Sequence, residues 1–368
     1  MKTKKIHILG TRGVPAQHGG FETFAENFAP YLVEKGWDVT VYCQADWQEN
    51  AQITRDMWQG VKRVIIPVKE RGNFTSMIFD WKATVEASKE KGLFLILGYN
   101  TAVYAGLLRL KRKKVIFNMD GFEWKRPKWP WHGKLWFYLN EWAGAWLGNH
   151  LIADHPEIKK HLLTRIFKDK VTTITYGSRV IKDGKVDILS DLGIEAGNYV
   201  TVIARPEPEN NTLEIVRAWS AKQRGCKLVV LGHFNRDHPY HTQVLDAAGD
   251  EVIFPGGIYE PERVDALRHY CKFYFHGHTV GGTNPSLVEA LGAGNAVLAH
   301  NNKFNRWVAG EGAVYFKDEV ELANKIGILL DNQRLLNELK EKARTRHSQA
   351  FTWPVILKAY EDLVEKFI

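Results

Sequence analysis

The stretch from Ile6 to Glu22 reads IHILGTRGVPAQHGGFE, and it decides the fold of the first half of the chain. A short β-branched run ends at Gly10, and a glycine-bearing loop leads directly into apolar residues at helical spacing, from Phe21 to Leu32. This order predicts a βα unit whose loop amides approach an anion at the helix N-terminus. The alternative is a glycine-rich turn needed only for backbone geometry. The loop matches neither Gly-x-Gly-x-x-Gly nor a P-loop. Gly36 is the expected helix stop, and Pro30 is expected to bend or shorten the helix.

The same alternation of short β-type runs and longer helical segments continues along the chain. It predicts an α/β fold with two Rossmann-like, doubly wound domains built on parallel sheets. The expected strands lie near Ile6–Gly10, Val39–Cys43, Val61–Ile66, Leu93–Leu97, Val115–Asn118, Leu151–Ala153, Val171–Ile174, Tyr199–Ala204, Lys227–Leu231, Val252–Phe254, Phe273–Phe275, Ala296–Ala299 and Val314–Phe316.

A length of 368 residues favours two domains. The pattern breaks at the glycine-bearing stretch from Tyr176 to Gly197, whose start is the predicted linker. We therefore expect an N-terminal domain over 1–177, a C-terminal domain over 178–350, and a last helix within 351–368 that packs back on the N-terminal domain.

Composition excludes several protein classes. Hydrophobic residues make up 45% and charged residues 25%, which excludes a disordered, collagen-like or coiled-coil chain. The net charge of +8 suits an anionic ligand or membrane surface. Three widely spaced cysteines indicate neither disulfides nor a zinc site, and we expect a cytoplasmic protein without a signal peptide or transmembrane helix.

Two loops in the second half have the residue types of a diphosphate site. Arg205 follows an expected strand, and a guanidinium there suits a diphosphate unless Glu207 or Glu209 pairs with it. The run from His276 to Gly294 is again strand, glycine loop and helix, with the helix expected to begin at Asn284 or Pro285 and to offer free N–H groups. Glu289 in that helix could accept two ribose hydroxyls, or it could serve only the helix dipole.

These residues carry a family resemblance. The half from Arg205 to Gly294 resembles the donor domain of glycosyltransferase family 4, nucleotide-sugar enzymes with the GT-B fold of two Rossmann-like domains facing across a cleft. The opening motif and DGFEWKR at 120–126 are similar to the bacterial subgroup that includes rhamnosyltransferases of polysaccharide assembly. The resemblance spans nearly the whole chain.

The resemblance implies roles for individual residues. Arg205 would neutralise the diphosphate, and Glu289 would hold the ribose. Asp120 would lie beside the anomeric carbon. These three are the expected catalytic residues. Asp120 and Glu123 could instead cap the segment that follows. The expected acceptor-binding residues are His18, Asp120, Glu123 and Trp124. The expected donor-binding residues are Gly19, Gly20, Arg205, Asn210, Ile258, Tyr259, His278, Gly282, Thr283, Asn284, Ser286 and Glu289.

The sequence departs from the family pattern at two positions. Gly281 replaces the first glutamate of the Glu-x7-Glu motif, and Asn210 replaces the lysine expected five residues after Arg205. We expect His278 or Arg12 to offset the lost cation. The sequence contains no Asp-x-Asp pair, so we expect catalysis without a metal and without a cofactor.

Tryptophans and cations alternate from Trp124 to Trp136, which suits lipid headgroups and sugar faces. The other interpretation is a helix core formed by Trp136, Leu139, Trp142 and Ala143. Single-stranded nucleic acid could also bind such aromatic and basic residues, but no other feature of the sequence supports nucleic-acid binding.

The resemblance thus implies a retaining transferase that moves a sugar, for instance L-rhamnose from dTDP-rhamnose, or a sugar from a UDP donor, to a saccharide acceptor. A lipid-linked acceptor and peripheral contact with the inner face of the plasma membrane fit this prediction. Two alternatives stay open, a GT-B sugar-nucleotide epimerase and a non-catalytic carbohydrate-binding protein with a degenerate donor site.

Overall fold

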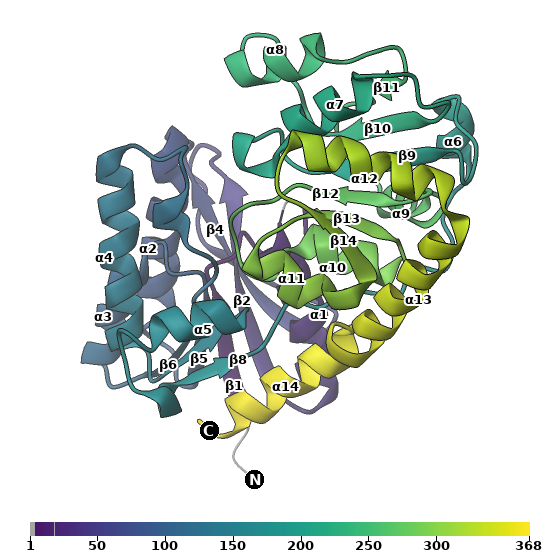
Figure 1. Ribbon diagram of the computed structural model, residues 1–368. Coiled ribbons are helices and arrows are strands. Elements are labelled where there is room, and N and C mark those ends of the chain that lie inside the picture. The colour runs from purple at the N-terminus through teal and green to yellow at the C-terminus, as the bar shows by residue number, and fades with distance from the viewer. Residues whose placement is uncertain (1–3, 18) are drawn as a thin grey trace. The chain divides into compact units, whose positions relative to one another are not determined.

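The computed structural model describes residues 4–17 and 19–368 (Figure 1). The chain divides into two compact units, one formed by residues 1–175 together with 353–368 and the other by residues 176–352. These limits lie two residues from the domain boundaries expected from the sequence. The last helix is part of the first unit.

The first unit is built on an eight-stranded sheet in the order β3-β4-β2-β1-β5-β6-β7-β8. All strand pairs are parallel except the pair of β3 with β4, which is antiparallel. The strands are β1 (Lys5–Leu9), β2 (Asp38–Asp46), β3 (Thr54–Trp58), β4 (Val61–Val68), β5 (Leu93–Leu97), β6 (Lys114–Asn118), β7 (His150–Ala153) and β8 (Val171–Thr173).

Helices connect these strands. The α-helices are α1 (Gly20–Glu34), α2 (Thr75–Ala87), α3 (Ala105–Leu110), α4 (Trp131–Leu147), α5 (Pro156–Leu162) and the C-terminal α14 (Trp353–Glu365). Short 3-10 turns are η1 (Gly72–Phe74), η2 (Ala102–Tyr104), η3 (Glu123–Lys125) and η4 (Lys168–Lys170). The expectation that Pro30 shortens α1 is wrong, because the helix continues to Glu34 and ends before Gly36.

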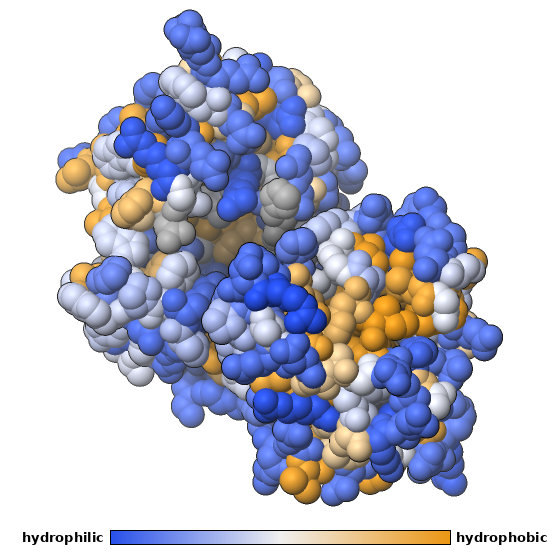
Figure 2. All heavy atoms as spheres, turned by 90° about the horizontal axis from the view of Figure 1, so that it is seen from above, coloured by the Kyte–Doolittle hydropathy of each residue, from blue (hydrophilic) through white to orange (hydrophobic). Residues whose placement is uncertain are grey.

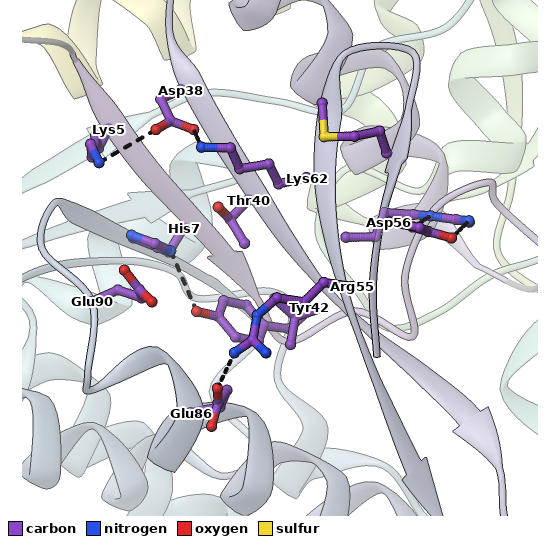
Figure 3. A pocket seen from close by; sticks show the side chains of 13 residues that line it. Lys5, His7, Asp38, Thr40, Tyr42, Arg55, Asp56, Lys62, Glu86 and Glu90 are labelled. Atoms are coloured by element: carbon purple, nitrogen blue, oxygen red, sulfur yellow. Dashed lines mark hydrogen bonds and ion pairs between the residues drawn. The ribbon is translucent and has the colours of Figure 1, made fainter. Parts of the chain in front are cut away.

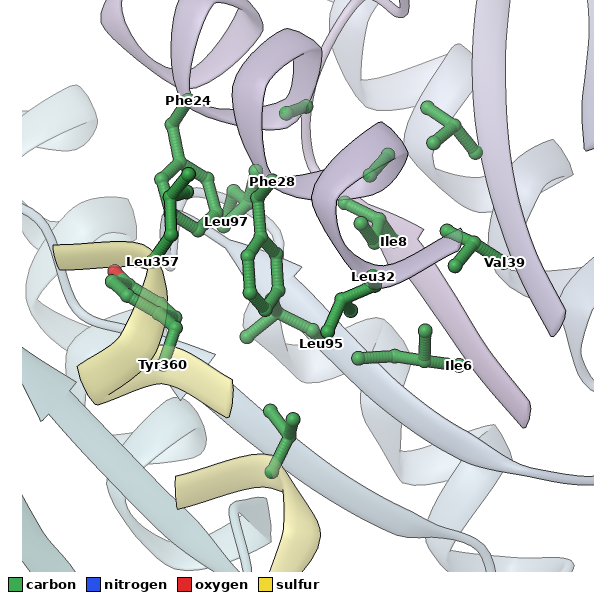
Figure 4. Close-up of a cluster of buried hydrophobic side chains, with 14 of the residues drawn as sticks. Ile6, Ile8, Phe24, Phe28, Leu32, Val39, Leu95, Leu97, Leu357 and Tyr360 are labelled. Atoms are coloured by element: carbon green, nitrogen blue, oxygen red, sulfur yellow. The ribbon is translucent and has the colours of Figure 1, made fainter. Parts of the chain in front are cut away.

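The helix α14 completes the core of the first unit. Figure 4 shows the Tyr360 side chain among the apolar side chains of α1 and of the sheet. Its ring centroid lies 4.4 Å from that of Phe24 and 5.4 Å from that of Phe28. Its hydroxyl oxygen accepts a hydrogen bond from Asn118 Nδ2 at 2.7 Å, so this buried polar group is satisfied. The C-terminal segment is therefore an integral part of the core.

The second unit has an all-parallel sheet in the order β11-β10-β9-β12-β13-β14. Its strands are β9 (Tyr199–Ile203), β10 (Lys227–Leu231), β11 (Val252–Ile253), β12 (Tyr274–His276), β13 (Val297–His300) and β14 (Ala313–Phe316). Its helices are α6 (Asp187–Asp191), α7 (Thr212–Ser220), α8 (Pro239–Asp246), α9 (Pro261–His269), α10 (Pro285–Gly292), α11 (Lys303–Ala309), α12 (Glu319–Asp331) and α13 (Gln333–Ala350), with 3-10 turns η5 (Pro208–Asn210) and η6 (Gly310–Gly312).

The predicted fold class, two Rossmann-like α/β domains, is confirmed. All of the expected strands are present, with ends shifted by up to three residues. The sequence did not predict β3, whose residues Thr54–Met57 are exposed. An edge strand without a buried face lacks the apolar alternation that marks a strand in the sequence.

Polar and charged side chains dominate the face shown in Figure 2, where hydrophobic residues also gather in a patch at the right of the view. A surface that mixes hydrophilic area with limited apolar patches is usual for a globular protein.

The loop after β1 requires glycine at its first position. Gly10 has φ +78°, and a Cβ there would lie 2.1 Å from the carbonyl oxygen of Leu97 on β5. Gly36 has a similar φ of +80°, but a Cβ there would meet nothing within 4 Å. Both positions have a left-handed backbone that disfavours alanine, but only Gly36 has space for a Cβ atom.

We predict that Gly10→Ala lowers the free energy of unfolding by about 3 kcal/mol or more, because Leu97 must move. Gly36→Ala is the matched control, with an expected cost of about 1 kcal/mol from the left-handed backbone alone. Urea denaturation of both variants measures the difference. Equal losses in the two variants would contradict the close approach of Gly10 to β5.

Candidate functional site

The candidate site of the second unit lies where its sheet changes direction. From β9 the chain first builds β10 and β11 on one side, and it then returns to build β12, β13 and β14 on the other side. Ligands of such open sheets bind at the carboxyl ends of the two strands that flank this switch point. The loops after β9 and β12 contain most of the predicted donor-binding residues, from Arg205 to Asn210 and from His278 to Ser286.

These two loops are joined by backbone contacts. The amide and the hydroxyl of Thr279 donate to the carbonyl oxygen of Glu209 at 2.9 and 3.0 Å. Asn211 Nδ2 donates to the carbonyl oxygen of Gly277 at 2.7 Å. A Cβ on Gly277 would lie 2.0 Å from the carbonyl oxygen of Asn210, so only glycine allows this approach. The loops therefore form one surface.

Arg205 is exposed on this surface, and its guanidinium forms no ion pair or hydrogen bond with the residues that the structure describes. Glu207 and Glu209, which could have paired with it, do not. The backbone of Arg205 is held by Asn210, whose Nδ2 donates to its carbonyl oxygen at 2.7 Å. Asn210 is 3% exposed, so this hydrogen bond is buried and fixes the backbone of Arg205.

The start of α10 differs from the expectation of free amides. Asn284 caps the helix as predicted, and its Oδ1 accepts from the Ser286 amide at 3.1 Å. Pro285 has no N–H group, and the amide of Leu287 donates to the Asn284 carbonyl oxygen. The Ser286 hydroxyl donates to the carbonyl oxygen of Ile203 at 2.9 Å. The first-turn amides are therefore occupied, and Ser286 fixes α10 to the end of β9.

The loop before α10 offers other donors. The amides of Gly281 and Gly282 make no hydrogen bond with described residues. Gly281 has φ +138°, a conformation that side-chain-bearing residues rarely adopt. The missing glutamate of the family motif thus coincides with a backbone that favours glycine. Thr283 is buried beside these glycines.

Glu289 is held by an arginine that the sequence analysis did not identify. Arg268 Nη2 on α9 lies 2.6 Å from Glu289 Oε2, and Arg268 is 6% exposed. Asp265 on the same helix pairs with Arg179. Burial raises the pKa of Asp265, against the nearby charges of Arg179 and Arg268. One carboxylate oxygen of Glu289 is fixed in this way, which leaves Oε1 for a ligand hydroxyl.

Two histidine rings stack at the end of β12. The centroids of His276 and His278 lie 4.4 Å apart with nearly parallel planes. Burial, and then the charges of His278 and His300, hold the pKa of His276 well below its usual value, so this ring is neutral. The His278 carbonyl oxygen accepts from Asn302 and Asn305 at 2.9 Å each, which fixes the loop backbone.

The predicted base-reading residues follow β11. Ile258 is partly buried and packs on the core cluster that Ile203 also contacts. Tyr259 is exposed.

In the first unit, the switch point lies between β1 and β5, beside the loop that begins at Gly10. Two carboxylates of α1 hold this loop, since Glu22 accepts from the Gln17 amide at 2.9 Å and Glu26 from the Ala16 amide at 3.0 Å. Gly19 and Gly20 open α1, and His18 lies outside the described residues. A cavity of about 340 Å³ adjoins the loop, with Arg12, Gln44 and Asp46 in its lining.

The predicted acceptor residues follow β6. Asp120 has φ +48°, a strained conformation for a residue with a side chain, and its amide donates to Asn118 Oδ1. Glu123 is buried and pairs with Arg126 at 2.8 Å. Trp124 Nε1 donates to Glu141 at 2.8 Å. Glu123 and Trp124 thus have partners within the unit, and Asp120 is the more accessible of the two carboxylates.

A second cavity of the first unit, about 400 Å³, lies over the opposite part of the sheet (Figure 3). Several of its charges pair with one another, since Asp38 lies between Lys5 and Lys62, and Arg55 pairs with Glu86. Lys5 and Asp38 open their strands, so this cavity is away from the carboxyl edge of the sheet.

Residues 4–17 and 19–368 contain no group of three or more His, Cys, Asp or Glu side chains placed to hold a metal ion. Over the same residues, none of the helices combines the length and the apolar character needed to span a bilayer.

Residues 188–346, most of the second unit, match the family model described as glycosyl transferases group 1. The second unit therefore has the fold of a group 1 glycosyltransferase domain. Residues 3–179 match a separate family model, described as a domain of unknown function (DUF1972). The search of curated proteins gave no match.

Several solved structures share the fold over the whole chain. Sucrose-phosphate synthase from Thermosynechococcus elongatus has a TM-score of 0.82 at 16% identity, covering 99% of each chain. Anabaena HepE in complex with UDP-glucose has a TM-score of 0.76 at 15% identity, covering 99% of each chain. An α,α-trehalose 6-phosphate synthase from Burkholderia multivorans has a TM-score of 0.76 at 11% identity, covering 99% of this chain and 97% of that one. The predicted GT-B fold of the group 1 glycosyltransferases is confirmed.

We predict strong energetic coupling between Arg268 and Glu289. Glu289→Gln leaves the buried guanidinium without its carboxylate and should lower the free energy of unfolding by about 3 kcal/mol. Arg268→Met should cost less, because Glu289 is partly exposed. The double variant should regain about 1–3 kcal/mol relative to the sum.

Urea denaturation of the four proteins measures this coupling. Additive losses would show that the ion pair does not hold Glu289 in place.

Proposed function

We propose that the protein is a retaining glycosyltransferase that moves a sugar from a nucleoside diphosphate to a saccharide acceptor. The observation that carries this proposal is the exposed guanidinium of Arg205, which has no partner among residues 4–17 and 19–368 and lies on the loop surface at the switch point of the second sheet. An arginine in such a position is a forked, permanently charged donor for phosphate oxygens.

The same surface supplies the other contacts that the donor needs. The amides of Gly281 and Gly282, which make no hydrogen bond with any described residue, can donate to the diphosphate and partly replace the cation that is lost at position 210. Oε1 of Glu289 can accept from ribose hydroxyls while Arg268 holds the other oxygen. Together these groups bind the nucleotide and stabilise the charge that develops on the leaving diphosphate.

The chemical step then depends mainly on orientation. In a retaining transfer the acceptor hydroxyl attacks from the side on which the nucleotide leaves, and the departing phosphate takes the hydroxyl proton. Asp120 is the proposed group that orients this hydroxyl or stabilises positive charge on the sugar ring. Its strained backbone is the kind of feature that persists where structure serves function. Positioning of this type supplies much of the rate of group transfer.

We also propose the finer assignment that the sequence suggests. The donor is a dTDP- or UDP-sugar, with dTDP-rhamnose as one candidate, and the acceptor is a lipid-linked saccharide of cell-surface polysaccharide assembly. The resemblance of 10–43 and 120–126 to rhamnosyltransferases supports the sugar. The UDP-glucose in the structurally similar HepE makes UDP-sugars the first donors to test.

Gly281 favours a second candidate function. Without the carboxylate that usually contacts the donor sugar, the site could bind nucleotide-sugar without transferring it, or could epimerise it. Product analysis with and without an acceptor separates the three cases. Transfer needs the acceptor, epimerisation does not, and a binding protein gives neither product.

We predict that Arg205→Ala lowers kcat/KM for transfer by about a hundredfold or more, because it removes a charged donor to the leaving diphosphate. Arg217→Ala is the matched control, since Arg217 is an exposed arginine on α7 of the same unit. It should leave both stability and turnover unchanged. Near-normal turnover of Arg205→Ala would refute the assigned role.

We further predict that transfer continues after extensive treatment with a chelator, because the chain lacks the Asp-x-Asp pair that binds a nucleotide-associated cation. The measurement compares initial rates before and after chelation, with added Mg²⁺ as the control. A loss of activity that Mg²⁺ restores would contradict metal-independent transfer.

A further inference from the structure

The helix α4 has an unusual orientation. Its buried side includes the polar residues Asn140 and Glu141, although a helix on a folded core normally buries its apolar side. Its exposed side carries the large apolar residues. These are Trp131, Leu135, Leu139 and Trp146, with exposed fractions of 76%, 48%, 55% and 67%, and the partly exposed Trp142.

These five residues, called here the α4 stripe, recur at intervals of three or four residues and so follow one side of the helix. The stripe spans about 22 Å at 1.5 Å per residue. Figure 1 shows α4 on the outside of its unit, at the left of the view. An apolar surface of this size that stays exposed indicates an interaction site.

A buried carboxylate fixes the orientation of α4. Glu141 Oε2 accepts from Trp124 Nε1 at 2.8 Å, and Oε1 lies 2.8 Å from His161 Nε2 and 3.0 Å from Arg165 Nη2. Burial alone would raise the pKa of Glu141, but the hydrogen bonds from His161 and Trp124 outweigh it and hold that pKa below its usual value. Turning the helix to bury the stripe would carry Glu141 away from these partners and leave the charge of the largely buried Arg165 without its carboxylate.

The surroundings of the stripe are basic. The sequence from Thr101 to Leu147 carries nine lysines and arginines against three acidic residues, in a chain whose net charge is +8. Two of the acids, Glu123 and Glu141, are buried in ion pairs. Lys125 and Lys128 are exposed just before α4, and Arg112 is exposed just after α3, which packs against α4.

We propose that the α4 stripe inserts into the headgroup region of an anionic phospholipid bilayer, with the basic residues around it bound to lipid phosphates. Tryptophan and leucine on one face of a helix, flanked by lysine and arginine, suit a helix that lies in the plane of the interface. Each basic residue near an anionic surface adds to the attraction. The proposal is independent of the transfer reaction and places the first unit, rather than a spanning helix, at the membrane.

The structure changes which tryptophans form this surface. The sequence suggested a belt from Trp124 to Trp136, but Trp124 binds Glu141 and Trp129 Nε1 donates to Glu123. The alternative, a helix core of Trp136, Leu139, Trp142 and Ala143, is wrong, because Leu139 is exposed and the buried apolar residues of α4 are Phe137 and Ala145.

A second copy of the chain is a less suitable partner. A symmetric dimer would place the same surface on itself, so the basic residues of both copies would meet without acidic counterparts. An anionic bilayer supplies the missing charge.

The test uses the full chain and vesicles made of equal parts phosphatidylcholine and phosphatidylglycerol. Trp131→Ser, Leu139→Ser and Trp146→Ser are combined in one variant, and co-sedimentation measures vesicle partitioning. We expect the partition coefficient to fall by about tenfold or more, because three interfacial side chains are lost. Partitioning of the unmodified protein should also fall with added salt and on vesicles of phosphatidylcholine alone.

The matched control is Val320→Ser with Ile328→Ser, two exposed apolar residues of α12 in the second unit, whose loss should not change partitioning. Calorimetry with UDP-sugar reports separately on the donor site, so a failed membrane proposal and a failed transferase proposal are distinguishable. Unchanged partitioning of the triple variant would overturn the proposal. The proposal would also be overturned if the unmodified protein formed a dimer and bound no vesicles, and the triple variant were a monomer.

Discussion

The candidate donor site depends on the close approach of two backbone segments at the switch point of the second sheet. The carbonyl oxygen of Asn210 lies where a side chain at Gly277 would stand, and hydrogen bonds from Thr279 and Asn211 hold the two loops together. Without this approach, Arg205 on one loop and Gly281 and Gly282 on the other could not serve one ligand. The site therefore requires glycine at position 277. Asn210 does not supply the positive charge of the lysine expected there, but it holds the backbone of Arg205 in place.

Electrostatic pairing separates the groups that are available to a ligand from those that are committed to the fold. The guanidinium of Arg205 pairs with none of the described residues, and Arg268 pairs with only one of the two carboxylate oxygens of Glu289. The sequence makes Ser286 and Glu123 equally plausible ligand-binding residues, but the polar atoms of both bind other residues of their own unit. In the first unit, the ion pairs of Glu141 have the further effect of turning the apolar side of α4 outward.

The sequence predicted the fold class and nearly all strands because buried parallel strands are short apolar runs between glycine loops and helices. It also predicted the cap at Asn284, which depends on neighbouring residues only. It failed where the decisive contacts are distant. The orientation of α4 depends on His161 and Arg165, twenty or more residues further along, and the partner of Glu289 is Arg268 on another helix. Periodicity marks the apolar side of a helix, but it does not show what that side faces.

The central claim is that the loops after β9 and β12 bind the diphosphate of a nucleotide-sugar. Hydrogen–deuterium exchange of the full chain, with and without a UDP- or dTDP-sugar, tests this directly, because bound ligand slows exchange of the amides that it covers. The account predicts protection of peptides that span 204–211 and 277–289. Protection confined to other segments, with these two unchanged under saturating nucleotide, would contradict it.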